Sequence, residues 1–530
     1  MTAPAGVPAA PVDERVDRRT LTLLFLTLMV VMLLASLSQM VLSSALPTLV
    51  GELNGVEHLS WVITAYLLAA TVTMPIYGKV SDLLGRKPLL LAAVILFIVG
   101  SVLGGLAHDM TMLIIARAVQ GLGGGGLMVL SQAAIADVVP ARERGRYMGI
   151  LGGVFAFSSV AGPLLGGWFT EGPGWRWTFW MNVPLGVVAV VAIAILLRVP
   201  PPARGARARI DYPGMVLLTL ATTGIVLIAT WGGTQFAWGS ATMVALIAGS
   251  LLAAGLFVVV ERRSPEPVIP LRLFRSRNFV LATTAGMLVS VAMFGAMSYM
   301  PTYFQMAAGA SATEAGLLMI PMMATFLTTS IVVGIAISRT GRYKVLPIIG
   351  SVVLAIGLGL LSTVGLETPI ALVCTWMALI GVGLGTSMQV MTLIVQNTFA
   401  HREVGTATAA QNYFRQVGGT LGTAVVGAVF AARLTGLLAD RVPAEAAAAP
   451  GVSSLTPELV AGLPEALRLP IVASYNDALM PIFLAVVPLA LAAAAVLVFL
   501  IEAPLATTIR GEGASGQDQG AKDREPTPLA

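Results

Sequence analysis

Residues 78–87 read GKVSDLLGRK, and the same spacing of glycine and arginine returns 256 residues later in the segment 334–342. The matching residues are Gly78, Gly85 and Arg86 in the first copy, and Gly334, Gly341 and Arg342 in the second. At an offset of 260, Gly121, Gly123 and Gly125 match Gly381, Gly383 and Gly385, and Arg142-Glu143-x-Gly145 matches Arg402-Glu403-x-Gly405. Each match is weak alone. The nearly constant offset indicates that the second part of the chain duplicates the first.

The composition places the chain in a bilayer. Of its 530 residues, 57% are hydrophobic and 11% are charged. Soluble proteins carry about 25% charged residues, so this chain cannot cover a water-facing surface. Its single cysteine, Cys374, excludes a disulfide framework and a cysteine metal site. The three histidines are far apart in the sequence, so we expect no metal and no cofactor.

Apolar stretches long enough to cross the hydrocarbon core, which takes about 20 helical residues, follow one another along the chain. The fourteen predicted spans are 21–47, 60–77, 89–107, 111–137, 146–170, 177–197, 212–231, 239–260, 279–305, 315–337, 345–364, 369–397, 405–432 and 478–501.

The basic residues predict the orientation of these spans. With both termini in the cytoplasm, 25 of the 31 Lys and Arg residues fall on the cytoplasmic side and four on the other side. The remaining two, Arg117 and Arg415, lie inside spans. Cytoplasmic loops are enriched in Lys and Arg, so both termini are expected inside. This distribution also accounts for the net charge of +5 without a nucleic-acid partner. Heavy use of Ala, Gly and Arg indicates a bacterial source, and hence the bacterial cell membrane.

The duplication divides the chain into two six-helix halves. The predicted parts are a cytoplasmic tail (1–20), the first half (21–198), two inserted spans with their linkers (199–278), the second half (279–505) with an external loop (433–477), and a disordered cytoplasmic tail (506–530). The fold class is therefore an all-α polytopic membrane protein. A duplicated half is typical of secondary transporters, whose substrate site lies between the halves near the bilayer midplane.

Four motifs carry a resemblance to a known family. They are GKVSDLLGRK (78–87), ARAVQGLGGG (116–125), VAGPLLGG (160–167) and WRWTFWMNVPLG (175–186). As a set they resemble the major facilitator superfamily, specifically its fourteen-span drug:proton antiporter branch, over about residues 20–505. The resemblance implies a major facilitator fold and a secondary exporter of amphipathic drugs, not an enzyme, that exchanges its substrate for protons by alternating access.

The chain departs from that branch at one position. The branch usually has an Asp nine residues before the Pro of an Ala-Leu-Pro. Here Ala45-Leu46-Pro47 is present, but the acid position is Ser38. A coupling role for that acid therefore does not carry over.

The segment 78–87 contains the first candidates for gating. Gly78 and Gly85 permit close helix approach and a tight turn. Asp82 lies beside Arg86, and the pair is interpreted as a charge latch between the halves, as the resemblance also implies. The alternative is a basic membrane anchor with an incidental acid.

Predicted span 5 contains a second set of gating candidates. Gly162, Gly166 and Gly167 remove side-chain bulk, so the helix can approach a partner closely. Pro163 lacks a backbone N–H and lets the helix bend. Bending and close packing suit a gate, and ordinary tolerance of these residues in membrane helices is the alternative.

Two arginines lie inside predicted spans 4 and 13. Arginine is costly in a bilayer and therefore faces the bundle interior or water. Neither residue has a counterpart in the duplicate, where Met377 and Phe155 stand. We assign Arg117 to coupling or gating and Arg415 to substrate binding or gating. The alternative for each is a hydrogen bond to a carbonyl or to a neighbouring Gln.

Proton coupling needs a group that titrates, and Arg does not. The predicted spans contain no Asp or Glu near mid-depth, so Asp137, at the end of span 4, is the best proton carrier. Its alternative is a solvated acid at a helix end. A dication would find no counter-charge at the midplane. We therefore expect neutral, zwitterionic or anionic amphipaths as substrates rather than dications.

The substrate pocket is predicted to be apolar with a few polar and aromatic residues from the spans. The candidates are Gln39, Tyr66, Gln132, Tyr303, Gln305, Asn397, Gln411, Asn412, Phe414 and Arg415. Met293, Met297 and Met388 are expected to give adaptable apolar surfaces. Helix packing is the alternative role for each candidate.

Other functions remain open at this point. The chain could export a lipid or a self-made metabolite, which the sequence does not separate from drug export. A proton-pumping respiratory subunit needs Lys and Glu relays inside the membrane, whereas all four lysines lie in loops or tails. A membrane enzyme would need clustered acids or histidines. The expected partners are the bilayer, protons and one small amphipathic substrate, and we expect a monomer.

Overall fold

The computed structural model describes residues 18–53, 58–197, 210–233, 235–307, 309–442, 460 and 462–505. Their regular secondary structure is helical. The first half contains α1 (Arg18–Leu53), α2 (Leu59–Leu84), α3 (Arg86–Gly105), α4 (Met110–Val138), α5 (Ala141–Glu171), α6 (Trp177–Trp180) and α7 (Asn182–Leu196). The inserted pair is α8 (Tyr212–Trp231) and α9 (Ala241–Arg263), followed by the short helix η2 (Leu271–Arg275). The second half contains α10 (Arg277–Ala307), α11 (Ala312–Leu318), α12 (Ile320–Thr340), α13 (Val345–Leu361), α14 (Ile370–Thr398), η3 (His401–Glu403), α15 (Val404–Arg441) and α18 (Glu465–Val498).

The helices agree with the predicted spans. In the described part, thirteen helical segments are long and apolar enough to cross a membrane. The one remaining predicted span, 345–364, corresponds to α13, which has 17 residues and is at the short end of the range for a transmembrane helix. The predicted fold class, an all-helical polytopic membrane protein, is therefore confirmed.

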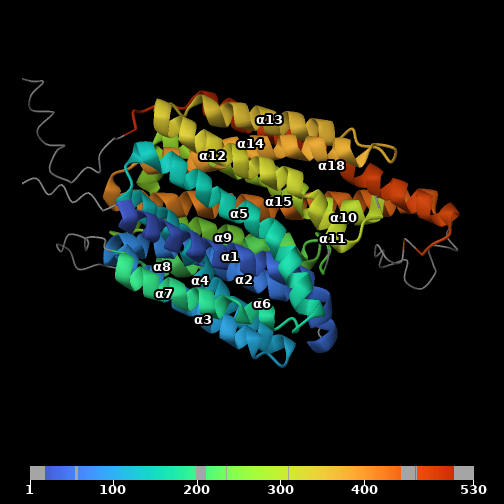
Figure 1. Cartoon of the computed structure of the whole chain (residues 1–530), viewed down its shortest axis with the longest axis horizontal. Coiled ribbons are helices and arrows are strands. Elements are labelled where there is room, and N and C mark those ends of the chain that lie inside the picture. Colours follow the sequence, from blue (N-terminus) through green and yellow to red (C-terminus); the bar gives the residue numbers. More distant parts are fainter. Residues whose placement is uncertain are drawn as a thin grey trace, which may run out of the picture.

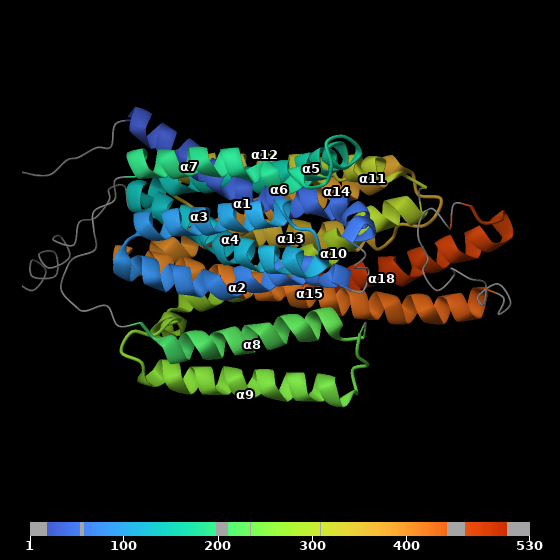
Figure 2. The same ribbon diagram turned by 90° about the horizontal axis from the view of Figure 1, so that it is seen from below.

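Helices α15 and α18 extend into a segment that was predicted to be a loop. The segment 433–477 was expected to be an external loop, but α15 continues to Arg441 and α18 begins at Glu465. The extensions pair with each other: Arg441 Nη2 lies 2.7 Å from Asp477 Oδ2, and Phe430 packs edge-on against Tyr475. Figure 2 shows both helices running past the rest of the bundle at one end. Residues 443–459 of the predicted loop lie outside the described part.

The helices pair in the same pattern in both halves. In the first half α3 and α2 pack on α4, and α1 packs on α5. In the second half the equivalent α13 and α12 pack on α14, and α10 packs on α15. The halves meet crosswise, because α2 packs on α15 and α12 packs on α5. Figure 1 shows these helices side by side as one elongated bundle.

Glycines from the repeated motifs make these crosswise contacts possible. A Cβ on Gly78 of α2 would overlap the carbonyl oxygen of Gly405 on α15. A Cβ on Gly334 of α12 would overlap the carbonyl oxygen of Gly145 on α5. Gly78 and Gly334 are the matching glycines of the first repeated motif, and Gly145 and Gly405 are those of the Arg-Glu-x-Gly motif. Each contact therefore joins the first motif of one half to the Arg-Glu-x-Gly motif of the other half. Close helix approach at small residues is typical of membrane proteins.

The inserted pair lies outside the main bundle (Figure 2). Of the two helices, α8 packs against α2 and α15, one from each half, and α9 packs on α8. Large apolar side chains on α9 are exposed, including Leu251 at 70% and Leu252 at 64%. In a bilayer these side chains would contact lipid tails.

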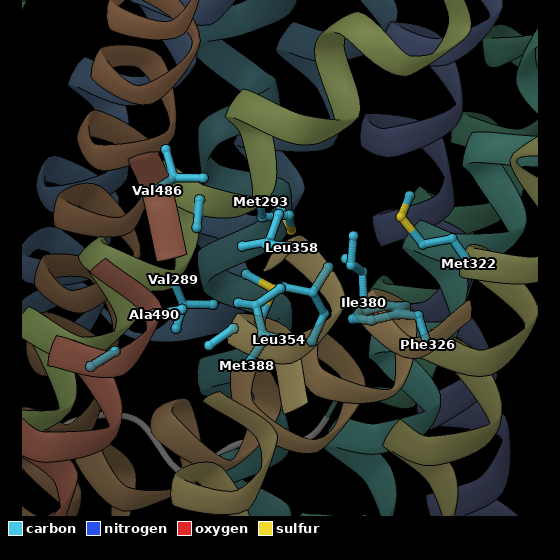
Figure 3. Close-up of a cluster of buried hydrophobic side chains, with 14 of the residues drawn as sticks. Val289, Met293, Met322, Phe326, Leu354, Leu358, Ile380, Met388, Val486 and Ala490 are labelled. Atoms are coloured by element: carbon cyan, nitrogen blue, oxygen red, sulfur yellow. The ribbon is translucent and has the colours of Figure 1, made fainter. Parts of the chain in front are cut away.

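The core of the second half is aliphatic and rich in methionine. Figure 3 shows Met293 of α10, Met322 and Phe326 of α12, Leu354 and Leu358 of α13, and Ile380 and Met388 of α14 within this cluster. These side chains are buried, with exposed fractions of 9% or less. The methionines and Phe326 bring flexible or large apolar groups close to the interface between the halves.

The corner between α2 and α3 is tighter than the predicted helix–loop–helix. Helix α2 continues to Leu84, and Gly85 alone separates it from α3. Gly85 has φ 97°, which only glycine adopts easily, and its repeat counterpart Gly341 has φ 72° at the end of α12. The predicted boundary of span 2 at residue 77 was therefore seven residues early.

Candidate functional site

A cavity of about 160 Å³ lies between the two halves, close to the middle of the bundle. Its wall is mostly apolar and includes six methionines, three phenylalanines and one tyrosine. They are Met32, Met40, Met74, Met128, Met293, Met388, Phe155, Phe294, Phe326 and Tyr66. The polar side chains in the wall are Ser36, Gln39, Gln389, Arg415 and Gln416. An apolar wall with a few polar groups is what a small-molecule site requires.

Three of the ten predicted substrate residues line this cavity: Gln39, Tyr66 and Arg415. Met293 and Met388, predicted as adaptable surfaces, also line it, whereas Met297 does not. Gln389 was not predicted. Its Oε1 atom is buried without a hydrogen-bond partner, so it can accept a hydrogen bond from a ligand. Its only sequence signal was that it is a polar residue within an apolar span.

Among the described residues that line the cavity, Arg415 is the only one with a charged side chain. It is 9% exposed, and its Nη2 donates to Asn412 Oδ1 at 2.5 Å. Asn412 in turn donates to Gln132 Oε1 of α4 at 2.8 Å. No carboxylate of the described residues forms an ion pair with Arg415. The cavity therefore presents a cation whose charge no carboxylate in the described part of the chain balances.

The remaining predicted substrate residues lie behind or away from the cavity wall. Gln132 and Asn412 hydrogen-bond across the halves, and Gln411 accepts a hydrogen bond from Thr392. Tyr303 donates to Asn476, Gln305 to a backbone carbonyl, and Asn397 to the carbonyl of Ala503. Phe414 packs edge-on against Phe274. The structure thus places packing and hydrogen-bonding contacts at these positions.

Arg117 is buried in the first half, at 2% exposure. Its Nε donates to the carbonyl of Val62 at 3.1 Å, its Nη1 donates to Gln120 Oε1 at 2.6 Å, and its guanidinium lies 4.3 Å from the centre of the Tyr66 ring. Gln120 Nε2 then donates to Ser38 Oγ at 3.0 Å. Ser38, the position discussed in the sequence analysis for its missing acid, is therefore linked to Arg117 through one intervening residue, Gln120.

Asp82 connects the halves at the end of the bundle where α2 meets α3, which we call the latch end. Its Oδ2 accepts hydrogen bonds from Thr406, at 2.6 Å from the backbone N and 2.5 Å from Oγ1. Arg86 Nη1 lies 2.5 Å from Asp82 Oδ1 within the same half. The contact across the halves is thus a carboxylate at the N-terminus of α15, where unpaired N–H groups favour negative charge.

Asp137 belongs to the same cluster. Arg86 Nε donates to Asp137 Oδ2 at 3.1 Å, and both side chains are 5% exposed. Arg117 lies 20 residues earlier on α4, about 30 Å along the helix axis, so the basic side chains that act on Asp137 are Arg86 and, electrostatically, Arg144. Asp137 is therefore not a solvated acid at a helix end but a buried partner of Arg86.

The glycines of α5 differ in their packing. A Cβ on Gly162 would overlap Met40 of α1, so the two helices approach closely there. No atom lies within 4 Å of the Cβ position of Gly167. Gly166 is buried, and Pro163 lies inside the helix, which continues through it. Pro163 and Gly167 line a separate cavity of about 260 Å³ beside α11.

The opposite end of the first half is held by Glu52. Its Oε1 accepts from Arg176 Nη1 and its Oε2 accepts from Trp175 Nε1, both at 2.6 Å. Arg176 also donates to the carbonyl of Ala107 at 3.1 Å. The hydrogen bond from Arg176, followed by that from Trp175, holds the pKa of Glu52 below its usual value. This contact ties α1 to the loops before α4 and α6.

Comparison with known proteins identifies the family. The sequence profile of the Major Facilitator Superfamily matches residues 28–423. The chain belongs to this superfamily. It is 41% identical to the uncharacterized MFS-type transporter Rv1877 of Mycobacterium tuberculosis, over 95% of this chain and 72% of that protein. It is 36% identical to the multidrug transporter protein MdtP of Bacillus subtilis, over 79% of this chain and 77% of that protein.

The fold agrees with this membership. The proton:xylose symporter XylE aligns with a TM-score of 0.57 at 17% identity, over 91% of this chain and 96% of XylE. At that identity the match speaks for the fold alone. The protein is therefore a multi-pass membrane transporter of the major facilitator type, in which the cavity between the halves is the candidate substrate site.

Proposed function

We propose that this major facilitator protein is an exporter of amphipathic small molecules in a bacterial cell membrane, driven by exchange with protons. The observation that carries the proposal is the cavity between the halves, which combines a methionine-rich apolar wall with Arg415, the one charged side chain among its described lining residues. The name of the relative MdtP, a multidrug transporter, supports the same substrate class. The working unit is a monomer with both termini in the cytoplasm.

The charge of the interior favours substrates that are not dications. Arg415 and Arg117 are both buried, and neither forms an ion pair with a carboxylate of the described residues. A dicationic substrate would lose hydration and meet a like charge. An acidic group on an amphipath would instead pair with Arg415 in a site of low dielectric, where such contacts are strong. Neutral and zwitterionic compounds carry no such penalty.

In this conformation the cavity is too small for a drug-sized ligand. Its volume is about 160 Å³, whereas sites for such ligands span roughly 300–1,000 Å³. Hydrogen bonds between the halves hold the latch end together through Asp82 and Thr406. Substrate entry therefore requires the halves to move apart, and the methionines of the wall can adapt to ligands of different shape.

Proton coupling is assigned to Asp137 and the latch. Arg86 is shared between Asp82 and Asp137. Protonation of Asp137 would remove its ion pair with Arg86, so that Arg86 would pair with Asp82 only. This would change the charge on the latch that joins Asp82 to Thr406. Arg117 is assigned to gating through Gln120. Arg117→Ala is expected to abolish transport in protein that still reaches the membrane, and Asp137→Asn is expected to uncouple efflux from the proton gradient.

The test is efflux from a drug-sensitive host across a panel of anionic, neutral and dicationic amphipaths, with and without a protonophore. The proposal expects export of the first two classes, abolished by the protonophore. Arg415→Gln should reduce export of anionic compounds by about tenfold, which corresponds to the free-energy contribution of one charge-assisted hydrogen bond. Export of neutral compounds should stay within about twofold. Arg342→Gln, at an exposed loop position, is the matched control.

A dicationic biocide exported as well as a neutral antibiotic would contradict the assigned substrate preference. Equal loss of all classes in the Arg415→Gln variant would show that Arg415 supports the fold or the gate rather than the substrate. Export that persists in the protonophore would contradict proton coupling.

A further inference from the structure

The linker between α9 and α10, residues 264–276, is tied to both halves by ion pairs. Lys79 Nζ of α2 lies 2.5 Å from Glu266 Oε2 of the linker. Arg272 Nη2 of the linker lies 2.6 Å from Glu403 Oε1, just before α15. The Lys79 side chain is 8% exposed and the Glu266 side chain 38%, so the ion pair is partly buried. One short segment therefore bridges the first and second halves.

The linker is packed mainly on the second half. Three of its apolar side chains are 2% exposed or less and belong to the core of that half: Val268, Ile269 and Leu273. Phe274 packs edge-on against Phe279 of α10 and Phe414 of α15. These contacts fix the linker to α10 and α15, so it should move with them.

The buried carboxylate of Glu261 shapes the linker. Glu261 is 3% exposed, and its Oε1 accepts a hydrogen bond from the backbone N of Val268 at 3.0 Å. This bond turns the chain back after α9 and directs Glu266 toward α2. The end of the inserted pair therefore sets the position of Glu266 relative to Lys79.

The linker and the latch share a cavity. A space of about 300 Å³ is lined by Lys79 and Asp82 of α2, Glu266 and Arg272 of the linker, and Glu403 and Thr406 of the second half. Separation of α2 from α15 at this end would therefore break two contacts at once. One is the hydrogen bonding of Asp82 to Thr406, and the other is the ion pair of Lys79 with Glu266.

We propose that Glu266 and Lys79 form a second latch, through which the linker after the inserted helices stabilises the state closed at this end. Glu266 is a positioning residue: it contacts no substrate and acts on the balance between the two transporter states through Lys79. The inserted pair thereby contributes to alternating access, although α9 lies outside the main bundle. This inference rests on the alternating access of the proposed function, but not on its substrate or its proton coupling.

The test measures the two states directly by electron–electron double resonance in lipid nanodiscs. In a Cys374→Ser background, spin labels replace Leu84 and Thr340, which are exposed at the latch end on opposite halves. A second label pair at His108 and Leu366 reports the opposite end. Glu266→Gln should raise the ratio of long to short distances at the latch end about fivefold, the effect of losing roughly one partly buried ion pair.

A charge exchange separates this contact from general damage. Lys79→Glu combined with Glu266→Lys should return the distance ratio to within about twofold of the parent. Glu143→Gln removes the same charge at an exposed position near the latch end and should leave the ratio unchanged. Should Glu266→Gln fail to fold, Lys79→Gln removes the same ion pair from the other side and must give the same shift.

An unchanged ratio in folded Glu266→Gln or Lys79→Gln protein would overturn the second latch, as would a shift that the charge exchange does not reverse. None of these measurements depends on transport. Absence of drug export would therefore contradict the proposed function without changing the outcome of this test. A reversible shift at the latch end supports the inference whatever the substrate proves to be.

Discussion

The Asp82 carboxylate of α2 accepts two hydrogen bonds from Thr406, the third residue of α15 in the other half, at 2.6 Å from the backbone N and 2.5 Å from Oγ1. A residue of the first half thus caps a helix of the second half. The cap exists only while the halves are together at this end. The cap therefore stabilises the transporter state in which this end is closed and does not stabilise the state in which it is open.

Loss of this cap should slow the interconversion of the two states. Asp82→Asn keeps an oxygen acceptor but removes the charge, and a hydrogen bond to a charged group contributes about 1.5–3 kcal/mol. We expect turnover in proteoliposomes to fall by about tenfold or more, while substrate affinity changes less than about twofold. Thr406→Val removes only the hydroxyl donor and should have a smaller effect. Normal turnover in both variants would show that the cap does not govern interconversion.

Ser38→Asp should change the charge preference of the transporter. Ser38 Oγ is 3.0 Å from Gln120 Nε2, and Gln120 also holds Arg117. A carboxylate there would offset the buried guanidinium and offer a counter-charge to cations. We expect a measurable gain in efflux of monocationic dyes and a change in its pH dependence. Ser38→Asn matches the size without the charge and should give no gain. Equal efflux by both variants would argue against a role for this position in charge selection.

The contact of Glu52 with Arg176 and Trp175 predicts a pH dependence of stability. Because the pKa of Glu52 is lowered in the folded protein, its contribution is present above its unfolded pKa of about 4.3. The contribution is lost as the pH falls through the lowered value. Glu52→Gln should therefore lower the melting temperature in detergent at pH 7 and have little effect near pH 3. Glu171→Gln, an exposed acid at the same end, is the control. A Glu52→Gln effect as large at pH 3 as at pH 7 would contradict this assignment.

The orientation in the membrane can be tested at loops that the structure describes. The 25-to-4 distribution of basic residues predicts that Arg342, between α12 and α13, faces the cytoplasm. Leu366, between α13 and α14, should then face outside, as should Trp238 between α8 and α9. Single cysteines at these positions should react with a membrane-impermeant maleimide in intact cells only at Leu366 and Trp238. Labelling at Arg342 alone would reverse the predicted topology.

Hydropathy along the chain was enough to predict the helices and their order. Each span needs about 20 apolar residues because the bilayer core leaves no other way to satisfy backbone groups, and this local requirement is visible in hydropathy. The repeat at offsets of 256 and 260 also indicated the two halves, since duplicated helices keep their packing glycines. Gly78 and Gly334 were recognisable in the sequence for this reason. Their partners Gly405 and Gly145 belonged to the other repeated motif.

Which side chains contact one another depends on the packing of the helices in three dimensions. Gln39, Tyr66 and Arg415 line the cavity, while Gln132 and Phe414, equally plausible by their position on spans, do not. The residues that line a cavity depend on how each helix is rotated about its axis and on how the two halves face each other. Hydropathy does not give this orientation. The extensions of α15 and α18 were missed for a similar reason. Polar helical turns outside the membrane are stabilised by contact between the two helices, as in the pair of Arg441 with Asp477. Neither segment shows this contact in its own sequence.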